Sequence, residues 1–351
     1  MTKVVVGLLL ALGMVAIWAA WAWLLSRDAG RRHRKRHRAA IGVFRGSIDA
    51  FFAGELTAPQ LRSAAREVSD LVFWSALERY GNARRAERRA LGETLERIGH
   101  VRRERRALRE GTPWRSELAA RRAGILAGPR NRRALHGALR SGPRLVAMAA
   151  ARALARRRDL RALRWLLAHA EHLPTRNPRT LAALFRVFGR GACGDLANTL
   201  ERSAHEPAVL TAMLNVLGSW RHRDAADVCA RKIVSESMEV RVAAIRALGE
   251  MASTRHAPAA VALLGDPAWP VRAQAARALG RMGAPSVVPV LAESTCDRAW
   301  WVRRHAAYAL GQLGEPGRAA LTAIRDRSPD PYAREMADEV LRGGFLRRTG
   351  S

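Results

Sequence analysis

A repeat with a period near 31 residues constrains the fold of this chain more than any other feature. The clearest copies are VRVAAIRALGEM from Val240, VRAQAARALGRM from Val271 and VRRHAAYALGQL from Val302. Another copy starts at Val209, and fainter ones start at Val146, Thr180 and Tyr332. Units of this length cannot each bury an apolar face alone, so they stack on one another. We therefore expect an all-α superhelix over residues 143–343.

The pattern inside each clear copy predicts a helical hairpin. Counting from the first valine, offsets 0, 4, 5, 7 and 8 are apolar, and offset 9 is Gly249, Gly280 or Gly311. This spacing is typical of an amphipathic helix that ends at a C-terminal glycine. Small alanines at the apolar offsets would allow close helix approach. The preceding stretch, such as residues 259–264 or 286–291, predicts the other helix of each pair.

The copies resemble the HEAT-repeat family, and more specifically its short subtype named after phycocyanobilin-lyase-like proteins. The resemblance rests on an Asp, five residues and an Arg, followed by AxxALG, and it covers residues 143–343. Asp266 with Arg272 and Asp297 with Arg303 match this pattern, whereas the copy from Val240 has Ser235 at the aspartate position. The resemblance implies a HEAT/armadillo-type solenoid in which Asp and Arg form a ladder between adjacent units. Arg241, Arg272 and Arg303 are then structural.

The second helix of each pair lines the concave surface in HEAT arrays, and we expect its offsets 3, 6 and 10 to face outward. These positions are Asn215, Ser219, Arg246, Glu250, Gln274, Arg277, Arg281, His305, Tyr308 and Gln312. Trp269 and Trp300 occupy equivalent loop positions, with Trp301 beside them. Aromatic residues at a repeat edge are typical binding anchors, although they could equally pack between repeats. A solvated helix face is the alternative for the polar positions. The candidate partner-binding residues are Arg246, Gln274, Arg277, Trp269, Trp300, Trp301, His305, Tyr308 and Gln312.

Residues 4–25 carry no charged side chain. At a rise of about 1.5 Å per residue, such a helix would cross a hydrocarbon core of about 30 Å. Trp18, Trp21 and Trp23 gather at its C-terminal end, and the run RRHRKRHR follows at residues 31–38. Basic flanks mark the cytoplasmic side. We expect an uncleaved signal anchor over residues 1–26, with the N-terminus outside, because a cleaved signal peptide would carry its charges before the apolar region.

The basic juxtamembrane segment, residues 27–40, is also expected to attract anionic lipid headgroups, at about 1 kcal/mol for each Lys or Arg. The candidate lipid-contacting residues are Arg31, Arg32, Arg34, Lys35, Arg36 and Arg38.

A helical, Arg-rich region follows over residues 41–142. The apolar stripe of residues 41–52 could lie on the bilayer or pack inward. A second helix is predicted after Thr57-Ala58-Pro59, and its apolar stripe continues to Leu77. Residues 84–110 read as one helix, either with a solvated face or as a short coiled-coil or partner-binding helix, before a break at Gly111-Thr112-Pro113.

Nothing in the sequence predicts a catalytic, metal-binding or cofactor-binding residue. Cys193, Cys229 and Cys296 are widely spaced and form no CxxC pair, so we expect buried, unreactive thiols. HEAT-like deoxyhypusine hydroxylases hold two irons with recurring His-Glu pairs, but only His205-Glu206 occurs at such a position.

The distribution of charge bears on the partner. Residues 1–204 hold 41 Lys and Arg against 16 Asp and Glu, whereas residues 205–351 hold 20 against 15. The basic excess therefore lies near the expected membrane segment, where lipid phosphate is the nearer anion. We expect a bacterial inner-membrane, single-pass scaffold or adaptor that binds a protein partner on the cytoplasmic side, such as a membrane enzyme or an envelope component. Nucleic-acid binding, as in HEAT-like DNA-repair glycosylases, is the alternative, followed by an unrecognised enzyme. Residues 344–351 form a tail.

Overall fold

The computed structural model describes residues 34–126, 128–170, 173, 177–202 and 206–343. These residues form helices and connecting turns, and no strand occurs among them, so the predicted all-α class is confirmed. The chain divides into two compact units, residues 1–154 and 155–351, at a boundary inside α8 (Arg144–Arg156). The domain boundaries predicted at residues 26, 40 and 142 stay predictions.

The described part of the N-terminal unit consists of short helices around one apolar core. Residues 34–52 are helical. They are followed by α2 (Ala58–Glu67), α3 (Asp70–Leu77), η1 (Glu78–Asn82), α4 (Arg85–Leu95), α5 (Gly99–Glu110), α6 (Pro113–Ala123), α7 (Pro129–Ser141) and α8. Phe44 and Ile48 are fully buried against Phe73 and Trp74 of α3. The stripe of residues 41–52 therefore packs inward.

Local signals placed several helix ends in this unit correctly. Helix α2 begins at Ala58, with Pro59 in its first turn and a capping box between Thr57 and Gln60. The predicted break at residues 111–113 is confirmed, because α5 ends at Glu110 and α6 begins at Pro113.

Two predicted helices are each split in the structure. The stripe that was expected to run on to Leu77 is interrupted by Ser69, which caps α3 by accepting a hydrogen bond from Val72 N at 3.3 Å. Residues 84–110 form α4 and α5 and not one helix. Their apolar stripe is buried in the unit's own core, which leaves no seam for a coiled-coil partner.

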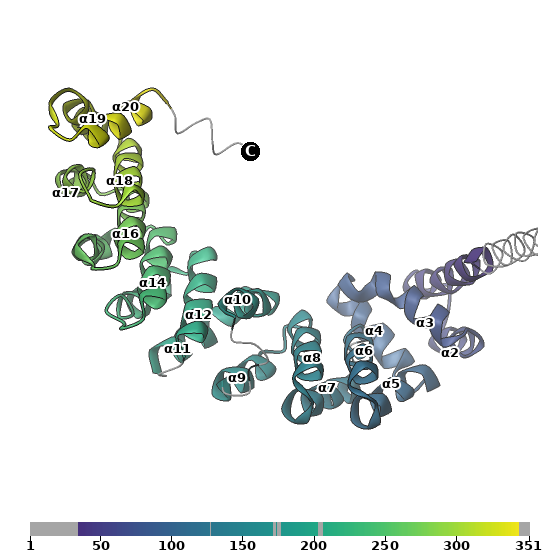
Figure 1. Cartoon of the computed structure of the whole chain (residues 1–351). Helices are drawn as coiled ribbons and strands as arrows, with labels where there is room; N and C mark the ends of the chain where they lie inside the picture. Colours follow the sequence, from purple (N-terminus) through teal and green to yellow (C-terminus); the bar gives the residue numbers. More distant parts are fainter. Residues whose placement is uncertain (1–33, 127, 171–172, 174–176, 203–205, 344–351) are drawn as a thin grey trace, which may run out of the picture. The chain divides into compact units, whose positions relative to one another are not determined.

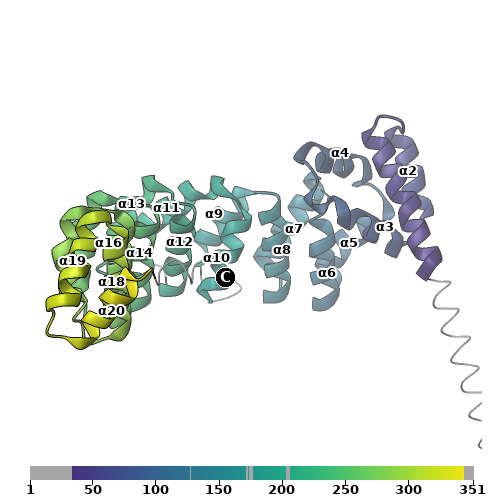
Figure 2. The ribbon, with the colours of Figure 1, turned by 90° about the horizontal axis from the view of Figure 1, so that it is seen from above.

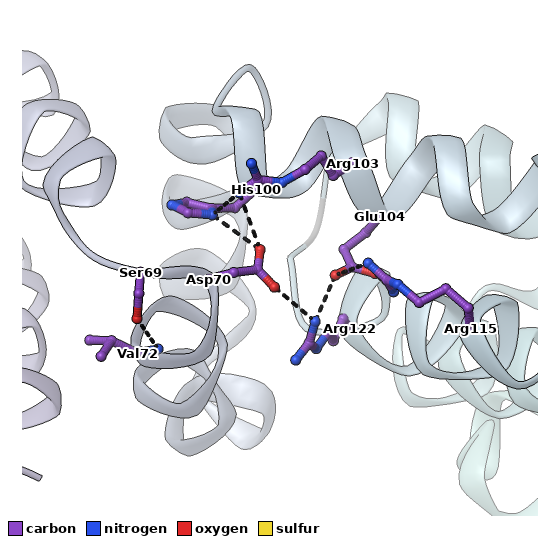
Figure 3. A network of polar contacts seen from close by, with 8 residues as sticks. All are labelled: Ser69, Asp70, Val72, His100, Arg103, Glu104, Arg115 and Arg122. Carbon is purple, nitrogen blue, oxygen red and sulfur yellow. Dashed lines mark hydrogen bonds and ion pairs between the residues drawn. The ribbon is translucent and has the colours of Figure 1, made fainter. Parts of the chain in front are cut away.

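A network of ion pairs holds α3, α5 and α6 together (Figure 3). The Glu104 carboxylate is 1% exposed and accepts hydrogen bonds from Arg115 at 3.0 Å and from Arg122 at 2.8 Å. Arg122 also donates to Asp70 at 3.1 Å, and His100 Nδ1 lies 3.1 Å from Asp70 Oδ1. Because a buried carboxylate is stable only when its charge is compensated, this network fixes the packing of the three helices.

The C-terminal unit is a stack of helices in two layers. One layer contains α10 (Pro178–Val187), α12 (Pro207–Ser219), α14 (Met238–Glu250), α16 (Trp269–Met282), α18 (Trp300–Gln312) and α20 (Pro331–Leu341). The other contains α9 (Leu160–Ala168), α11 (Cys193–Arg202), α13 (Ala226–Ala230), α15 (Ala257–Ala262), α17 (Val288–Ser294) and α19 (Gly314–Arg327). Each helix of the first layer packs on the next, as Figures 1 and 2 show. Within this unit the first layer follows the inner side of the curve in Figure 1, and we call it the inner layer. The solenoid is confirmed.

Among the described residues, no helix has both the length and the apolar character needed to cross a membrane. The transmembrane helix predicted over residues 1–26 lies outside the described residues, as do Arg31 and Arg32.

Candidate functional site

A ladder of charges sets the register of the inner layer. Arg241 donates to both carboxylate oxygens of Asp266 at 2.8 and 3.0 Å, and Arg272 makes the same fork to Asp297 at 2.8 and 2.9 Å. Each arginine thus reaches the aspartate of the following unit, and it also donates to backbone carbonyls of its own unit. Ser235 contributes such a carbonyl at 2.9 Å, so the missing aspartate there does not break the Arg241 contact.

The ladder ends at Arg303, which meets no aspartate of a following unit within the residues that the structure describes. Its guanidinium lies 4.9 Å from the ring centre of Tyr332 and donates to the carbonyl of Asp297 at 2.9 Å. A cation over an aromatic face is a weaker partner than a bidentate carboxylate. Arg303 therefore joins α18 to α20 by stacking instead of by an ion pair.

Close glycine contacts bring the inner-layer helices together. An added Cβ on Gly218, Gly249 or Gly280 would lie 2.7, 2.9 or 2.8 Å from the Cα of the alanine at offset 7 of the next unit. Gly249 and Gly280 lie within α14 and α16 and do not have positive φ. The interpretation of these glycines as helix ends is therefore wrong. They are needed because the neighbouring backbone leaves no room for a side chain.

Offset 6 carries an exposed arginine in α14 and in α16. Arg246 donates to Asn215 Oδ1 of the preceding helix at 3.4 Å, and Arg277 has no ion pair within the described residues. Burial lowers the pKa of Arg277, and the charges of Arg281 and Arg246 lower it further, against the opposing effect of Glu250. Glu250, the carboxylate that acts on Arg277, forms its ion pair with Arg281. The surface around Arg277 is therefore positive.

The C-terminal end of the inner layer is aromatic. Trp300 and Trp301 are 42% and 50% exposed and contact each other edge-on at 4.7 Å. Arg304 lies over the rings of Trp300 and Tyr308 and pairs with Glu339 of α20, whose carboxylate also accepts from Tyr308 at 2.7 Å. Tyr308 thus has a structural role in joining α18 to α20.

The other predicted face residues differ in their surroundings. Trp269 is 47% exposed, and both it and Trp300 begin a helix instead of lying in a loop. Gln312 is exposed. Burial, and then the charges of Arg277 and Arg304, lower the pKa of His305, which is therefore neutral at pH 7. The prediction that Gln274 faces outward is wrong, because offset 3 of α16 points toward neighbouring helices and Gln274 is 7% exposed.

A cleft of about 280 Å³ lies across α10, α12 and α14. Its walls include Arg179, Arg186 and Arg246 against one carboxylate, that of Glu250. Arg179 and Arg186 have no ion pair in the part of the chain that the structure describes. Sequence reasoning missed both, although Arg186 stands at offset 6 of the faint copy from Thr180 and extending the rule to that copy would have found it.

The remaining candidates concern lipid and metal. Arg34, Lys35, Arg36 and Arg38 are exposed on the helix of residues 34–52, and their contact with lipid stays a prediction. No group of three or more potential metal ligands occurs among the described residues. Burial raises the pKa of Cys229 to about 12, which makes it unreactive, whereas Cys296 is exposed and the prediction of a buried thiol there is wrong.

A family model described as HEAT repeats matches residues 195–269 and 257–342. Among solved structures, two crystal structures of engineered proteins each show 19% identity. The first has a TM-score of 0.43, and the match covers 85% of this chain and 87% of the engineered protein. The second has a TM-score of 0.28, and the match covers 70% of this chain and 96% of the engineered protein. Human deoxyhypusine hydroxylase in complex with glycerol shows 16% identity, a TM-score of 0.30, and coverage of 86% and 96%. A search of curated proteins gave no match.

Proposed function

We propose, because residues 195–342 belong to the HEAT-repeat family, that this protein is a scaffold that binds a protein partner on the inner layer of its repeat array. HEAT repeats generally mediate protein interactions. The observation that carries the proposal is the line of exposed side chains at offset 6, from Arg186 through Arg246 to Arg277. Arg246 and Arg277 are held on α14 and α16, which carry the ladder arginines, and the three arginines at offset 6 have no ion pair within the described residues.

The chemistry of this face favours a partner segment that carries carboxylates. A guanidinium without an ion pair at a surface can form a fork of two hydrogen bonds with a carboxylate. The exposed Trp300 and Trp301 would add apolar contact area at the far end, as aromatic anchors do at protein interfaces. Nucleic acid is less favoured because Glu250 and Glu339 lie on the same layer and would repel a continuous phosphate backbone.

We also propose that the array is tethered at the cytoplasmic face of a bacterial inner membrane by residues 1–26. The uncharged stretch of residues 4–25 and the basic run after it support this arrangement. Deletion of residues 1–30 is expected to move the folded, helical protein from the membrane fraction to the soluble fraction. If the protein stays with the membrane after this deletion even in a high-salt wash, which screens the lipid contacts of the basic run, the proposed tether is refuted.

Partner binding can be tested by site-specific photocrosslinking in cells. A photoreactive residue at position 215, beside Arg246, is expected to give a discrete protein adduct, whereas one at position 322 on α19 of the other layer should not. The adduct should be lost in Arg246→Gln/Arg277→Gln. It should persist in Arg202→Gln/Arg318→Gln, which removes the same charge from exposed positions of α11 and α19. Adducts with nucleic acid, or protein adducts unchanged in the first variant, would refute the proposed face.

A further inference from the structure

A cleft of the N-terminal unit is lined by four arginines and by no carboxylate. It measures about 770 Å³ and lies among α5, α6 and α7. Arg105 and Arg109 project from one face of α5, and Arg130 and Arg133 project from one face of α7. Ser116 and Ser141 add hydroxyls to the walls. This cleft plays no part in the scaffold function proposed above.

The cleft arginines differ from other arginines of the same unit. Arg103 pairs with Asp70, and Arg115 and Arg122 pair with Glu104. Arg109, Arg130 and Arg133 have no such partner among the described residues. Side chains three or four positions apart on a helix are neighbours, and like charges at this spacing destabilise it. An arrangement that brings four guanidinium groups together is therefore relieved by a bound anion.

Glu96, the carboxylate whose charge acts on Arg105, already accepts hydrogen bonds from backbone N–H groups. Glu96 is 8% exposed, and its Oε1 accepts hydrogen bonds from the backbone N–H of Arg130 at 2.6 Å and of Asn131 at 3.4 Å. Arg105 donates to the Glu96 carbonyl and to Asn131 Oδ1 at 2.9 and 3.0 Å, so its guanidinium is fixed at the cleft wall. Burial lowers the pKa of Arg105, Glu96 opposes this, and the charges of Arg130, Arg102 and Arg109 lower it further.

We propose that the cleft among α5, α6 and α7 binds a ligand carrying a phosphate or diphosphate group, held by Arg105, Arg109, Arg130 and Arg133. The planar guanidinium forms paired hydrogen bonds with phosphate oxygens. The cleft volume lies in the range of small-molecule sites and far exceeds one phosphate. The body of the ligand would contact Leu108, Ala134 and Ala138 on the apolar part of the wall. Such a group belongs to a soluble phosphate compound or to a lipid headgroup.

The test is calorimetric titration of the purified full-length chain in non-ionic detergent with inorganic pyrophosphate and, separately, with dihexanoylphosphatidic acid. Arg109→Gln/Arg133→Gln is expected to weaken binding of the preferred probe by about 10-fold or more, because two charge-assisted contacts are lost. Arg109→Lys/Arg133→Lys should weaken it less. Both arginines are exposed and make no described ion pair, so these variants should keep the helical circular dichroism of the parent.

The matched control is Arg132→Gln/Arg140→Gln, which removes the same charge from exposed positions of α7 that do not line the cleft. Its affinity should stay within about 2-fold of the parent, since these side chains make no ligand contact. Loss of pyrophosphate binding only in the cleft variant supports a soluble ligand, and loss of phosphatidic acid binding only there supports a lipid headgroup. Binding of neither probe, or equal weakening in the cleft and control variants, would overturn the proposal.

Discussion

Removal of one ladder carboxylate tests how the array holds its register. In Asp297→Ala, Arg272 loses the fork to Asp297 but stays buried, since the side chains of this pair are 6% and 14% exposed. Breaking a buried pair on one side leaves an uncompensated charge and costs about 3–5 kcal/mol. For a unit of this size, each kcal/mol lowers Tm by about 2–4 °C, so we expect Tm to fall by about 10 °C.

A matched control distinguishes burial from pairing alone. Arg231 and Glu201 also pair between neighbouring units, at 2.6 Å, but their side chains are 55% and 51% exposed. Because exposed ion pairs contribute about 0–1 kcal/mol, Glu201→Ala should lower Tm by only about 2 °C. A double replacement, Arg272→Met/Asp297→Leu, removes both charges and should recover most of the loss.

Thermal unfolding of these variants at pH 7, followed by circular dichroism at 222 nm, measures the three effects. If Asp297→Ala and Glu201→Ala lower Tm equally, the buried ladder pair contributes no more to stability than an exposed ion pair. If the double replacement is as unstable as Asp297→Ala, the cost lies in lost packing and not in the unpaired charge of Arg272. Either result would refute the reasoning.

Three further predictions follow from individual contacts. Gly280→Ala should destabilise the array by about 1–2 kcal/mol in urea unfolding, because the clash with the next helix outweighs the better helix propensity of alanine. Burial raises the pKa values of Asp266 and Asp297, but hydrogen bonds and nearby arginines outweigh this effect and set both below 3.8. The ladder should therefore stabilise the array fully above about pH 4 and lose this contribution as the pH falls further. Urea unfolding midpoints measured across this pH range test the prediction. Finally, a maleimide should label Cys296 rapidly in the native protein and leave Cys229 unlabelled until it unfolds, as read by mass spectrometry.

Local sequence signals predicted what depends on neighbours along the chain. The period of 31 residues gave the stacked hairpins, and Thr57 with Pro59 gave the start of α2. The offset rule also predicted the exposure of Arg246 and Arg277, because one face of an amphipathic helix in a stack must remain polar. These inferences need no knowledge of distant contacts.

The sequence did not predict features that depend on contacts between residues far apart along the chain. Gln274 is buried because the inner layer packs on both sides of α16, which a single-helix pattern does not contain. Glu96 follows the last residue of α4 at the split between α4 and α5, and its carboxylate caps the start of α7 from 34 and 35 residues away. Arg105 and Arg109 belonged to the helix that could have a solvated face, and no sequence pattern singled out Arg130 or Arg133. Only the absence of carboxylates from the folded cleft distinguishes them.

The two classes of arginine in the repeats also constrain the proposed partner. Arg241 and Arg272 are neutralised one unit along the chain, whereas Arg186, Arg246 and Arg277 stand at offset 6 and pair with no carboxylate in the described part of the chain. Adjacent packed helices lie about 8–10 Å apart, and an extended chain advances about 3.3–3.6 Å per residue. An extended segment crossing the inner layer would therefore place every third side chain over a successive helix. The segment that fits this face has acidic residues three positions apart, with a neutral polar residue opposite Asn215. In a uniformly acidic chain, two of every three carboxylates would lie at positions without a facing arginine.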